Sequence, residues 1–255
     1  MKKKKWLLIP LVLLVLIFGA TGVYLGTYYH ASDEALNIAA NDAIEVKIGS
    51  RNILIFGTEG EQLSEEYDEN KPVFIFYPGG KVEMEAYAPL CQKISDRGSV
   101  CVLIEMPFNL AVLDADAATD VIGYLSENLS NCDFYIGGHS LGGAMSAYYA
   151  CDNAEQLDGL ILLGAYSSKD LSDTDLSVLS IYGSEDGVLS RDKYEECLPN
   201  LPSDFTELVI DGGCHSYFGS YGMQKGDGIP EISREEQMEE SAEIIAEWME
   251  EKKEA

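Results

Sequence analysis

One serine in this sequence stands in a pattern that predicts a nucleophile. Ser140 is flanked by glycines in the run GHSLG at residues 138–142. In a Gly-x-Ser-x-Gly turn the serine has a strained backbone, and the glycines avoid clashes with the neighbouring strand and helix. Residues 133–136 favour a strand and residues 144–150 can form a helix, which is the context the motif requires. The alternative is a tight strand-to-helix turn with an ordinary serine.

A serine hydroxyl attacks a substrate only when a base takes its proton and a carboxylate orients that base. The chain has three histidines. His30 lies beside an N-terminal apolar run, and the side chain of His139 would point away from the nucleophile's face. His215 follows a predicted strand in a glycine-rich loop, so we predict that it is the base. A solvated loop histidine is the alternative.

Three carboxylates compete to orient His215. Asp186 follows a predicted strand and gives the chain order Ser, Asp, His, which serine hydrolases with this strand-turn-helix motif use. Glu185 is also consistent with a solvated side chain, and Asp211 with a cap at the end of a strand. We therefore predict a catalytic triad of Ser140, Asp186 and His215.

The tetrahedral intermediate of acyl transfer needs two hydrogen-bond donors for its oxyanion. The backbone N–H of Leu141, directly after the nucleophile, is the first candidate. The second should come from the loop PGGK at residues 78–81, where glycine lets the backbone approach a substrate closely. We predict the Gly80 N–H, with Lys81 as the next candidate. The alternative is a structural glycine turn.

The elements that must position these residues alternate between strands and helices. Residues 44–48 and 52–56 predict an antiparallel hairpin at a sheet edge, and residues 73–77 form an apolar run typical of a strand buried on both faces. The alternation predicts an α/β fold with a mostly parallel central sheet, helices on both faces, and a ligand site at the carboxyl ends of the strands. Further strands are expected near residues 100–105, 133–136, 160–164, 177–183 and 207–211, and helices near 83–97, 114–129, 144–150, 191–198 and 233–252.

About a dozen residues separate the strand that ends at Gly164 from the strand that starts near Ser177. This is too short for an inserted helical lid. We therefore predict an open, shallow site suited to small or surface-displayed acyl esters.

The N-terminus combines four lysines, Lys2 to Lys5, with an apolar run from Trp6 to about Gly26. A run of ~20 apolar residues can cross a bilayer as a helix, whereas the apolar core of a secretory signal is usually shorter. We predict a single uncleaved transmembrane helix, and a removed signal peptide is the alternative. The lysines favour a cytoplasmic N-terminus and an extracytoplasmic domain. The expected organisation is an anchor at residues 1–30, a linker at 31–43 and a catalytic domain at 44–255.

The charge and the composition limit the classes of partner and cofactor that we expect. The sequence has 17 basic and 44 acidic residues, a formal net charge of −27, and such a surface repels nucleic acid. No histidine has metal-ligand spacing to cysteine or acidic residues, so we predict no metal and no cofactor. The six cysteines form no Cys-x-x-Cys pair. An extracytoplasmic domain would permit disulfides, but six cysteines allow 15 connectivities.

These motifs resemble the small α/β-hydrolase family related to dienelactone hydrolase, over roughly residue 43 to the C-terminus. Residues 106–111 and 221–228 also look like that family's bacterial membrane-anchored members. The resemblance implies an α/β-hydrolase fold, the triad named above and its two backbone donors. Two positions depart from the family pattern: Cys214 stands where members often carry asparagine, and Ser140 stands where dienelactone hydrolases proper use cysteine. The similar segments are YPGG at 77–80, GHSLGG at 138–143, GSEDG at 183–187 and GCHSYFGSYG at 213–222.

The sequence thus predicts a membrane-anchored serine hydrolase that cleaves a small-molecule carboxylic ester through an acyl-enzyme. Its expected partners are the ester substrate and the bilayer around its N-terminal helix. A peptidase or amide hydrolase of the cell envelope would use the same triad. A binding module that keeps the fold without turnover is the non-enzymatic alternative.

Overall fold

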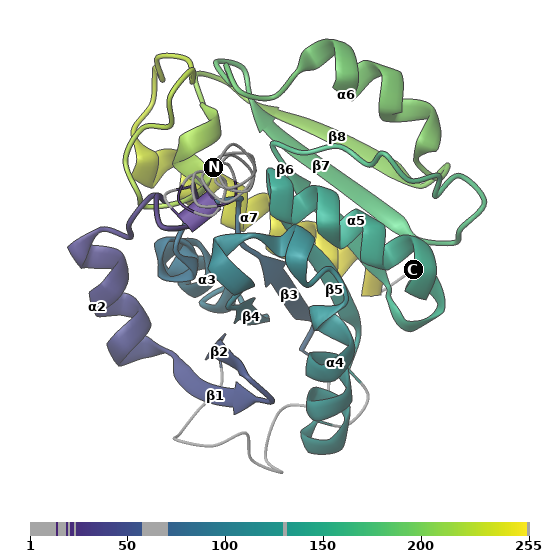
Figure 1. Cartoon of the computed structure of the whole chain (residues 1–255). Helices are drawn as coiled ribbons and strands as arrows, with labels where there is room; N and C mark the ends of the chain where they lie inside the picture. Colours follow the sequence, from purple (N-terminus) through teal and green to yellow (C-terminus); the bar gives the residue numbers. More distant parts are fainter. Residues whose placement is uncertain are drawn as a thin grey trace, which may run out of the picture.

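The core of the molecule is a sheet whose six successive strands β3 to β8 are parallel, with an antiparallel hairpin at one edge. The computed structural model describes residues 24–57, 71–129 and 132–253, with residues 14, 19, 21 and 22. Within these residues the sheet has eight strands in the order β1-β2-β4-β3-β5-β6-β7-β8, as Figure 1 shows in part. The strands are β1 (Ile44–Ile48), β2 (Arg51–Phe56), β3 (Val73–Tyr77), β4 (Val100–Ile104), β5 (Phe134–His139), β6 (Gly159–Leu163), β7 (Ser177–Gly183) and β8 (Phe205–Ile210).

The structure confirms both the predicted edge hairpin and the predicted strand that is buried on both faces. β1 pairs antiparallel with β2, as the hairpin prediction requires. β3 is buried along its whole length, and its side chains alternate between two hydrophobic cores because successive residues of a strand point to opposite faces. Phe74 and Phe76 belong to one core, while Val73, Ile75 and Tyr77 belong to the other. A strand covered on both faces therefore needs a continuous apolar run.

Helices cover both faces of the sheet, as predicted. The core that contains Phe74 is closed by α2, α3 and α7, which contribute Ala35, Leu90 and Ile245. The opposite core is closed by α4 and α5, through residues such as Val121; Figure 1 shows α5 and α7 on opposite sides of the strands. The helices are α2 (Asp33–Asp42), α3 (Ala88–Ser95), α4 (Ala117–Asn128), α5 (Leu141–Asn153), α6 (Arg191–Cys197) and α7 (Arg234–Lys253).

The predicted need for glycine around Ser140 is confirmed by close backbone contacts. A Cβ on Gly142 would lie 2.1 Å from the carbonyl oxygen of Tyr77, and one on Gly138 would lie 2.3 Å from the same oxygen. This oxygen belongs to a central strand and cannot move far. β3 therefore packs against the β5–α5 turn at a distance that only glycine allows.

Replacing Gly142 by alanine is expected to lower the free energy of unfolding by about 3 kcal/mol, the upper part of the range for overpacking. Gly123, in the middle of α4, is the matched control because a Cβ there would meet nothing within 4 Å. Gly123→Ala should raise the free energy of unfolding by about 0.5–1 kcal/mol, since alanine is the better helix former. Urea unfolding followed by circular dichroism measures both. Equal effects from the two substitutions would contradict the packing argument.

The continuous description of the N-terminal part of the chain begins at Tyr24. The predicted membrane helix, Trp6 to about Gly26, lies mostly outside the described residues, as does most of the expected anchor at residues 1–30. Across the described ranges, no helix combines the length and the apolar character that crossing a bilayer requires. The expected linker at residues 31–43 contains α2, whose Ser32 cap accepts a hydrogen bond from the Ala35 N–H. Ala35 and Ala39 of α2 are buried.

Candidate active site

Ser140 occupies a sharp turn between β5 and α5. Its φ of 54° and ψ of −119° lie in a region that costs a non-glycine residue about 1–3 kcal/mol. The Ser140 N–H donates to the Leu163 carbonyl of the neighbouring strand at 2.9 Å, which helps to hold this conformation. The strand-turn-helix context expected of the motif is therefore present, at the carboxyl edge of the sheet.

Asp186 and His215 form a buried pair at the same edge. The His215 Nδ1 lies 2.8 Å from the Asp186 Oδ2, and both side chains are almost fully buried. The second carboxylate oxygen, Oδ1, accepts the N–H groups of Val188 and Leu189 at 2.9 and 2.7 Å. The carboxylate is thus fixed on both sides, and it can hold the imidazole with its Nε2 directed away from Asp186.

The competing carboxylates do not reach His215. Glu185 is exposed, and its side chain accepts a hydrogen bond from Ser184. Asp211 is also exposed. Of the three candidates weighed from the sequence, the structure brings only Asp186 to the imidazole.

Ser140 and His215 line one open cavity of about 440 Å³, within the usual range for a small-molecule site. The His215 Nε2 is buried and has no hydrogen-bond partner among the described residues, so the bond between His215 and the Ser140 hydroxyl is not formed in this structure. Hydrogen bonds of this kind are often long without substrate and tighten in the complex. The other lining residues are mainly small or apolar: Leu141, Ala144, Gly164, Ala165, Tyr166, Ser168, Val188, Leu189 and Ser190.

The two predicted oxyanion donors lie next to each other. Leu141 is the first residue of α5, where a backbone N–H has no partner within the helix. Gly80 packs against it, since a Cβ on Gly80 would lie 2.8 Å from the Leu141 side chain. The alternative donor, the Lys81 N–H, already donates to the Asn109 carbonyl at 2.6 Å. Gly80 is therefore the better candidate of the two.

His139, which the sequence did not connect to the site, packs against the predicted base His215. The rings of His139 and His215 pack at 4.3 Å between centroids, and the His139 Nδ1 shares a hydrogen bond of 2.8 Å with the Tyr87 hydroxyl. Burial, followed by the proximity of His215, holds the pKa of His139 well below its ordinary value. His139 is therefore a neutral packing surface for the predicted base. No sequence spacing marks this role, because Tyr87 lies 52 residues away.

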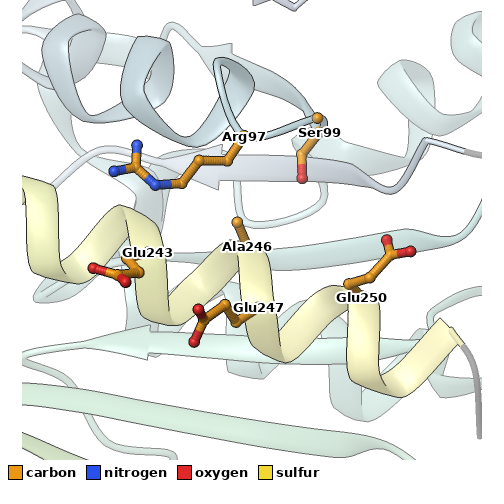
Figure 2. A pocket seen from close by; sticks show the side chains of 7 residues that line it. Arg97, Ser99, Glu243, Ala246, Glu247 and Glu250 are labelled. Atoms are coloured by element: carbon orange, nitrogen blue, oxygen red, sulfur yellow. The ribbon is translucent and has the colours of Figure 1, made fainter.

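A larger hollow of about 590 Å³ lies elsewhere, beside the residues that lead into β4 and along α7 (Figure 2). It is at the amino ends of the parallel strands, away from the candidate triad. Its lining contains no histidine, so no serine–histidine pair of the predicted kind lies there. The smaller cavity at the carboxyl edge is therefore the candidate active site. The larger one is lined by Arg97, Gly98, Ser99, Glu243, Ala246, Glu247 and Glu250.

Asp227 holds together the two loops that carry the acid and the base. Its Oδ1 accepts the N–H groups of Gly187 at 3.2 Å, His215 at 3.1 Å and Gly228 at 2.9 Å. Its Oδ2 accepts the N–H of Ser216 at 2.7 Å and the Ser216 hydroxyl at 2.6 Å. Burial alone would raise the pKa of Asp227, but the hydrogen bonds from Ser216, Gly187 and His215 outweigh it and lower the pKa. Asp227 is thus a positioning residue.

The Asp227→Asn variant is expected to lose about 100-fold in kcat/KM for the substrate of the site, since a displacement of about 1 Å can have such an effect. Because the pKa of Asp227 is lower in the folded than in the unfolded chain, the wild type gains stability above the ordinary aspartate pKa and loses it as pH falls through the lowered value. The variant should lack that part of the pH dependence. Steady-state kinetics and urea unfolding between pH 3 and 7 test both statements. Wild-type kinetics in a folded variant would remove the positioning role.

Gln237 of α7 secures the same loop from behind. Its side-chain oxygen accepts the Cys214 N–H at 2.9 Å, and its side-chain nitrogen donates to the Cys214 carbonyl at 2.8 Å. Both partners are backbone groups of Cys214, so these two bonds fix the loop whatever side chain stands at position 214.

Comparison with known proteins decides the family. The model described as "Alpha/beta hydrolase family" matches residues 73–239, more than half of the 255 residues. The chain belongs to the α/β-hydrolase family. A search of curated proteins finds no match.

Solved structures of other α/β hydrolases share the fold at low sequence identity. Est1E from Butyrivibrio proteoclasticus is 14% identical with a TM-score of 0.61, over 83% of this chain and 99% of its own. A membrane phospholipase A, described as a bacterial virulence factor, is 13% identical with a TM-score of 0.61, over 99% and 100%. Dienelactone hydrolase from Anabaena variabilis is 15% identical with a TM-score of 0.58, over 82% and 96%. The expected likeness to dienelactone hydrolase is confirmed at the level of the fold.

Proposed function

We propose that this α/β hydrolase is a serine carboxylesterase with Ser140 as nucleophile, His215 as general base and Asp186 as the group that orients the base. The observation that carries the proposal is the buried pair of Asp186 and His215, because His215 lines the same cavity as Ser140 and its Nε2 has no hydrogen-bond partner among the described residues. A buried imidazole with a carboxylate on one nitrogen is suited to take a proton at the other.

The reaction follows from these positions. The Ser140 hydroxyl attacks the ester carbonyl carbon while the His215 Nε2 takes its proton, and the oxyanion receives hydrogen bonds from the N–H groups of Leu141 and Gly80. His215 then gives the proton to the leaving alcohol, which leaves the acyl group on Ser140. Water, deprotonated by His215, releases the acid and restores the serine.

The open cavity supports small or surface-displayed acyl esters as substrates. Residues 164–176, all of them described, contain no helix between β6 and β7, so no inserted lid covers the site from this position. Two structural relatives also support an ester substrate. One solved form of Est1E has ferulic acid bound, and the membrane phospholipase A is named for the hydrolysis of phospholipid esters.

The proposal includes a membrane anchor formed by the N-terminal residues. Lys2 to Lys5 and the apolar run from Trp6 to about Gly26 support it, with the catalytic domain on the extracytoplasmic side. Extraction of the full-length protein from membranes by detergent, but not by carbonate at high pH, is the expected result.

A fluorophosphonate label and a substrate panel test the enzymatic part. The wild-type protein should react with the fluorophosphonate and hydrolyse 4-nitrophenyl esters of acetate to octanoate. A matched panel of 4-nitroanilides separates ester from amide specificity, because acyl group and aromatic ring are kept while the leaving oxygen becomes nitrogen. Faster cleavage of the anilides would assign the site to an amide hydrolase. A folded protein with neither labelling nor turnover would contradict both the esterase and the amide hydrolase assignment.

A further inference from the structure

The N-terminal segment around Tyr29 is hydrogen-bonded to the loop that carries the predicted oxyanion donor Gly80. The Tyr29 N–H donates to the Lys81 carbonyl at 2.7 Å, and the Glu83 N–H donates to the Tyr29 carbonyl at 3.0 Å. Tyr29 and Val82 therefore form a parallel β-bridge. Because these are backbone bonds on both sides, the N-terminal segment has a fixed position at the carboxyl edge of the sheet.

The same segment also contacts the loop that contains His215. The rings of Tyr29 and Tyr221 pack at 5.5 Å between centroids, and the Ser32 N–H donates to the Ser220 carbonyl at 2.8 Å. Figure 1 shows this purple segment beside the yellow-green loops that follow β8. The Lys81 ammonium lies over the Tyr24 ring, 4.1 Å from its centroid. The segment thus joins two of the loops that build the active site.

The distance from this attachment to the apolar run is short. The run ends at about Gly26, and only two residues separate it from Tyr29. Three residue steps of fully extended chain span at most about 11 Å. If the apolar run is the proposed anchor, the loop with Gly80 lies within that distance of the membrane interface. The opposite edge of the sheet cannot approach the bilayer in its place.

Exposed large apolar side chains gather at this same edge. Carboxyl ends of parallel strands meet at one edge of a sheet, so the loops after β3, β4 and β8 share it. Among the described residues from Tyr24 to Lys253, six of the ten exposed large apolar side chains are found on these loops or against them. The members at this edge, which we call the apolar rim, are Tyr24, Phe108, Val112, Leu113, Met223 and Ile229; those elsewhere are Leu36, Tyr148, Leu208 and Val209.

We propose that the apolar rim rests on the bilayer that holds the anchor, and that the substrate is an acyl ester that resides in that bilayer. The inference rests on the proposed function. The attachment of Tyr29 sets the orientation, and the rim supplies apolar area that an aqueous surface would leave exposed. An ester bond near the headgroups then faces the open cavity. The net charge of −27 disfavours anionic headgroups, so zwitterionic lipid is the suitable bilayer.

Two 4-nitrophenyl esters that differ only in the acyl chain separate bilayer substrates from dissolved ones. The full-length protein is reconstituted in phosphatidylcholine vesicles and given 4-nitrophenyl butyrate in water or 4-nitrophenyl palmitate within the vesicles. The test variant changes Val112, Leu113 and Ile229 to serine, and the control variant changes Tyr148, Leu208 and Val209 to serine. All six side chains are exposed, so neither variant disturbs the core.

The test variant should lose at least tenfold in palmitate hydrolysis while its kcat/KM for butyrate stays within twofold of the wild type. The control variant should match the wild type with both esters. Unchanged palmitate hydrolysis in the test variant, or an equal loss in the control, overturns the bilayer inference. Hydrolysis of butyrate that depends on Ser140, with no hydrolysis of palmitate by the wild type, also overturns it but leaves the proposed function intact. Failure with both esters refutes the proposed function itself.

The orientation of the catalytic domain on the bilayer can be measured without an activity assay. Tryptophan is introduced at Val112 in one variant and in another at Glu250, an exposed residue that lines the hollow at the amino ends of the strands, and each is reconstituted in vesicles of brominated phosphatidylcholine. Quenching above the wild-type level is expected for the Val112→Trp variant and not for Glu250→Trp. The reverse pattern would show that the catalytic edge faces water, whatever the enzymatic activity.

Discussion

Ser140→Ala is expected to lower kcat for 4-nitrophenyl butyrate by a factor on the order of 10⁴ or more, with the protein still folded. Alanine keeps the Cβ but removes the only atom that can form the acyl-enzyme, so just the oxyanion donors and substrate binding contribute. The backbone at this position has a positive φ of 54°, which alanine tolerates no worse than serine. Fluorophosphonate labelling should disappear along with turnover.

Ser168 provides the matched control for this substitution. It lines the same cavity and is exposed, but it follows no strand-to-helix turn. Ser168→Ala should keep kcat within a few-fold of the wild type and should retain the label. If Ser140→Ala labels as strongly as the wild type, the nucleophile is another residue and the assignment of the site is wrong.

Asp186→Asn is expected to lower kcat by a factor on the order of 10⁴, as loss of the orienting carboxylate does in a serine triad. The amide oxygen can still accept the N–H groups of Val188 and Leu189, which now bond Oδ1. The amide nitrogen then faces the His215 Nδ1. Because that nitrogen donates, the imidazole proton moves to Nε2, and Nε2 can no longer accept the serine proton.

The two rejected carboxylates are natural controls for Asp186→Asn. Glu185→Gln and Asp211→Asn remove a negative charge from exposed positions near the same loops. Both variants should retain kcat within about twofold, because exposed charges are well screened. A large loss in Asp211→Asn with little change in Asp186→Asn would transfer the orienting role to Asp211.

Much of this fold could be predicted from local sequence patterns. The run VFIFY at residues 73–77 is continuous because β3 is covered on both faces, and the alternating run from Ile44 to Ile48 reflects a half-exposed edge strand. The turn at Ser140 can be recognised from a short motif, because two of its five residues, Gly138 and Gly142, must be glycine. Where a short stretch of chain meets a strict steric demand, the sequence alone is sufficient.

The support of the site could not be predicted in this way. Asp227 is one of 44 acidic residues, and nothing near it in sequence shows that its carboxylate collects N–H groups from two loops. His139 fits the serine motif whether or not its ring packs on His215. The attachment of Tyr29 to Val82 joins residues 53 positions apart. Each of these contacts depends on where the folded chain brings distant segments, and no periodicity records that.

The Gln237 contact has a consequence for how the protein becomes active during synthesis. The Cys214 backbone, which precedes the predicted base, is held by a side chain of α7, and Ala242, Ile245 and Met249 of that helix are buried. Gln237 follows Ser140 by 97 residues, so translation reaches this helix well after the nucleophile. A nascent chain therefore has its nucleophile before the helix that fixes the loop of the predicted base, and the site can assemble only after that helix has also left the ribosome.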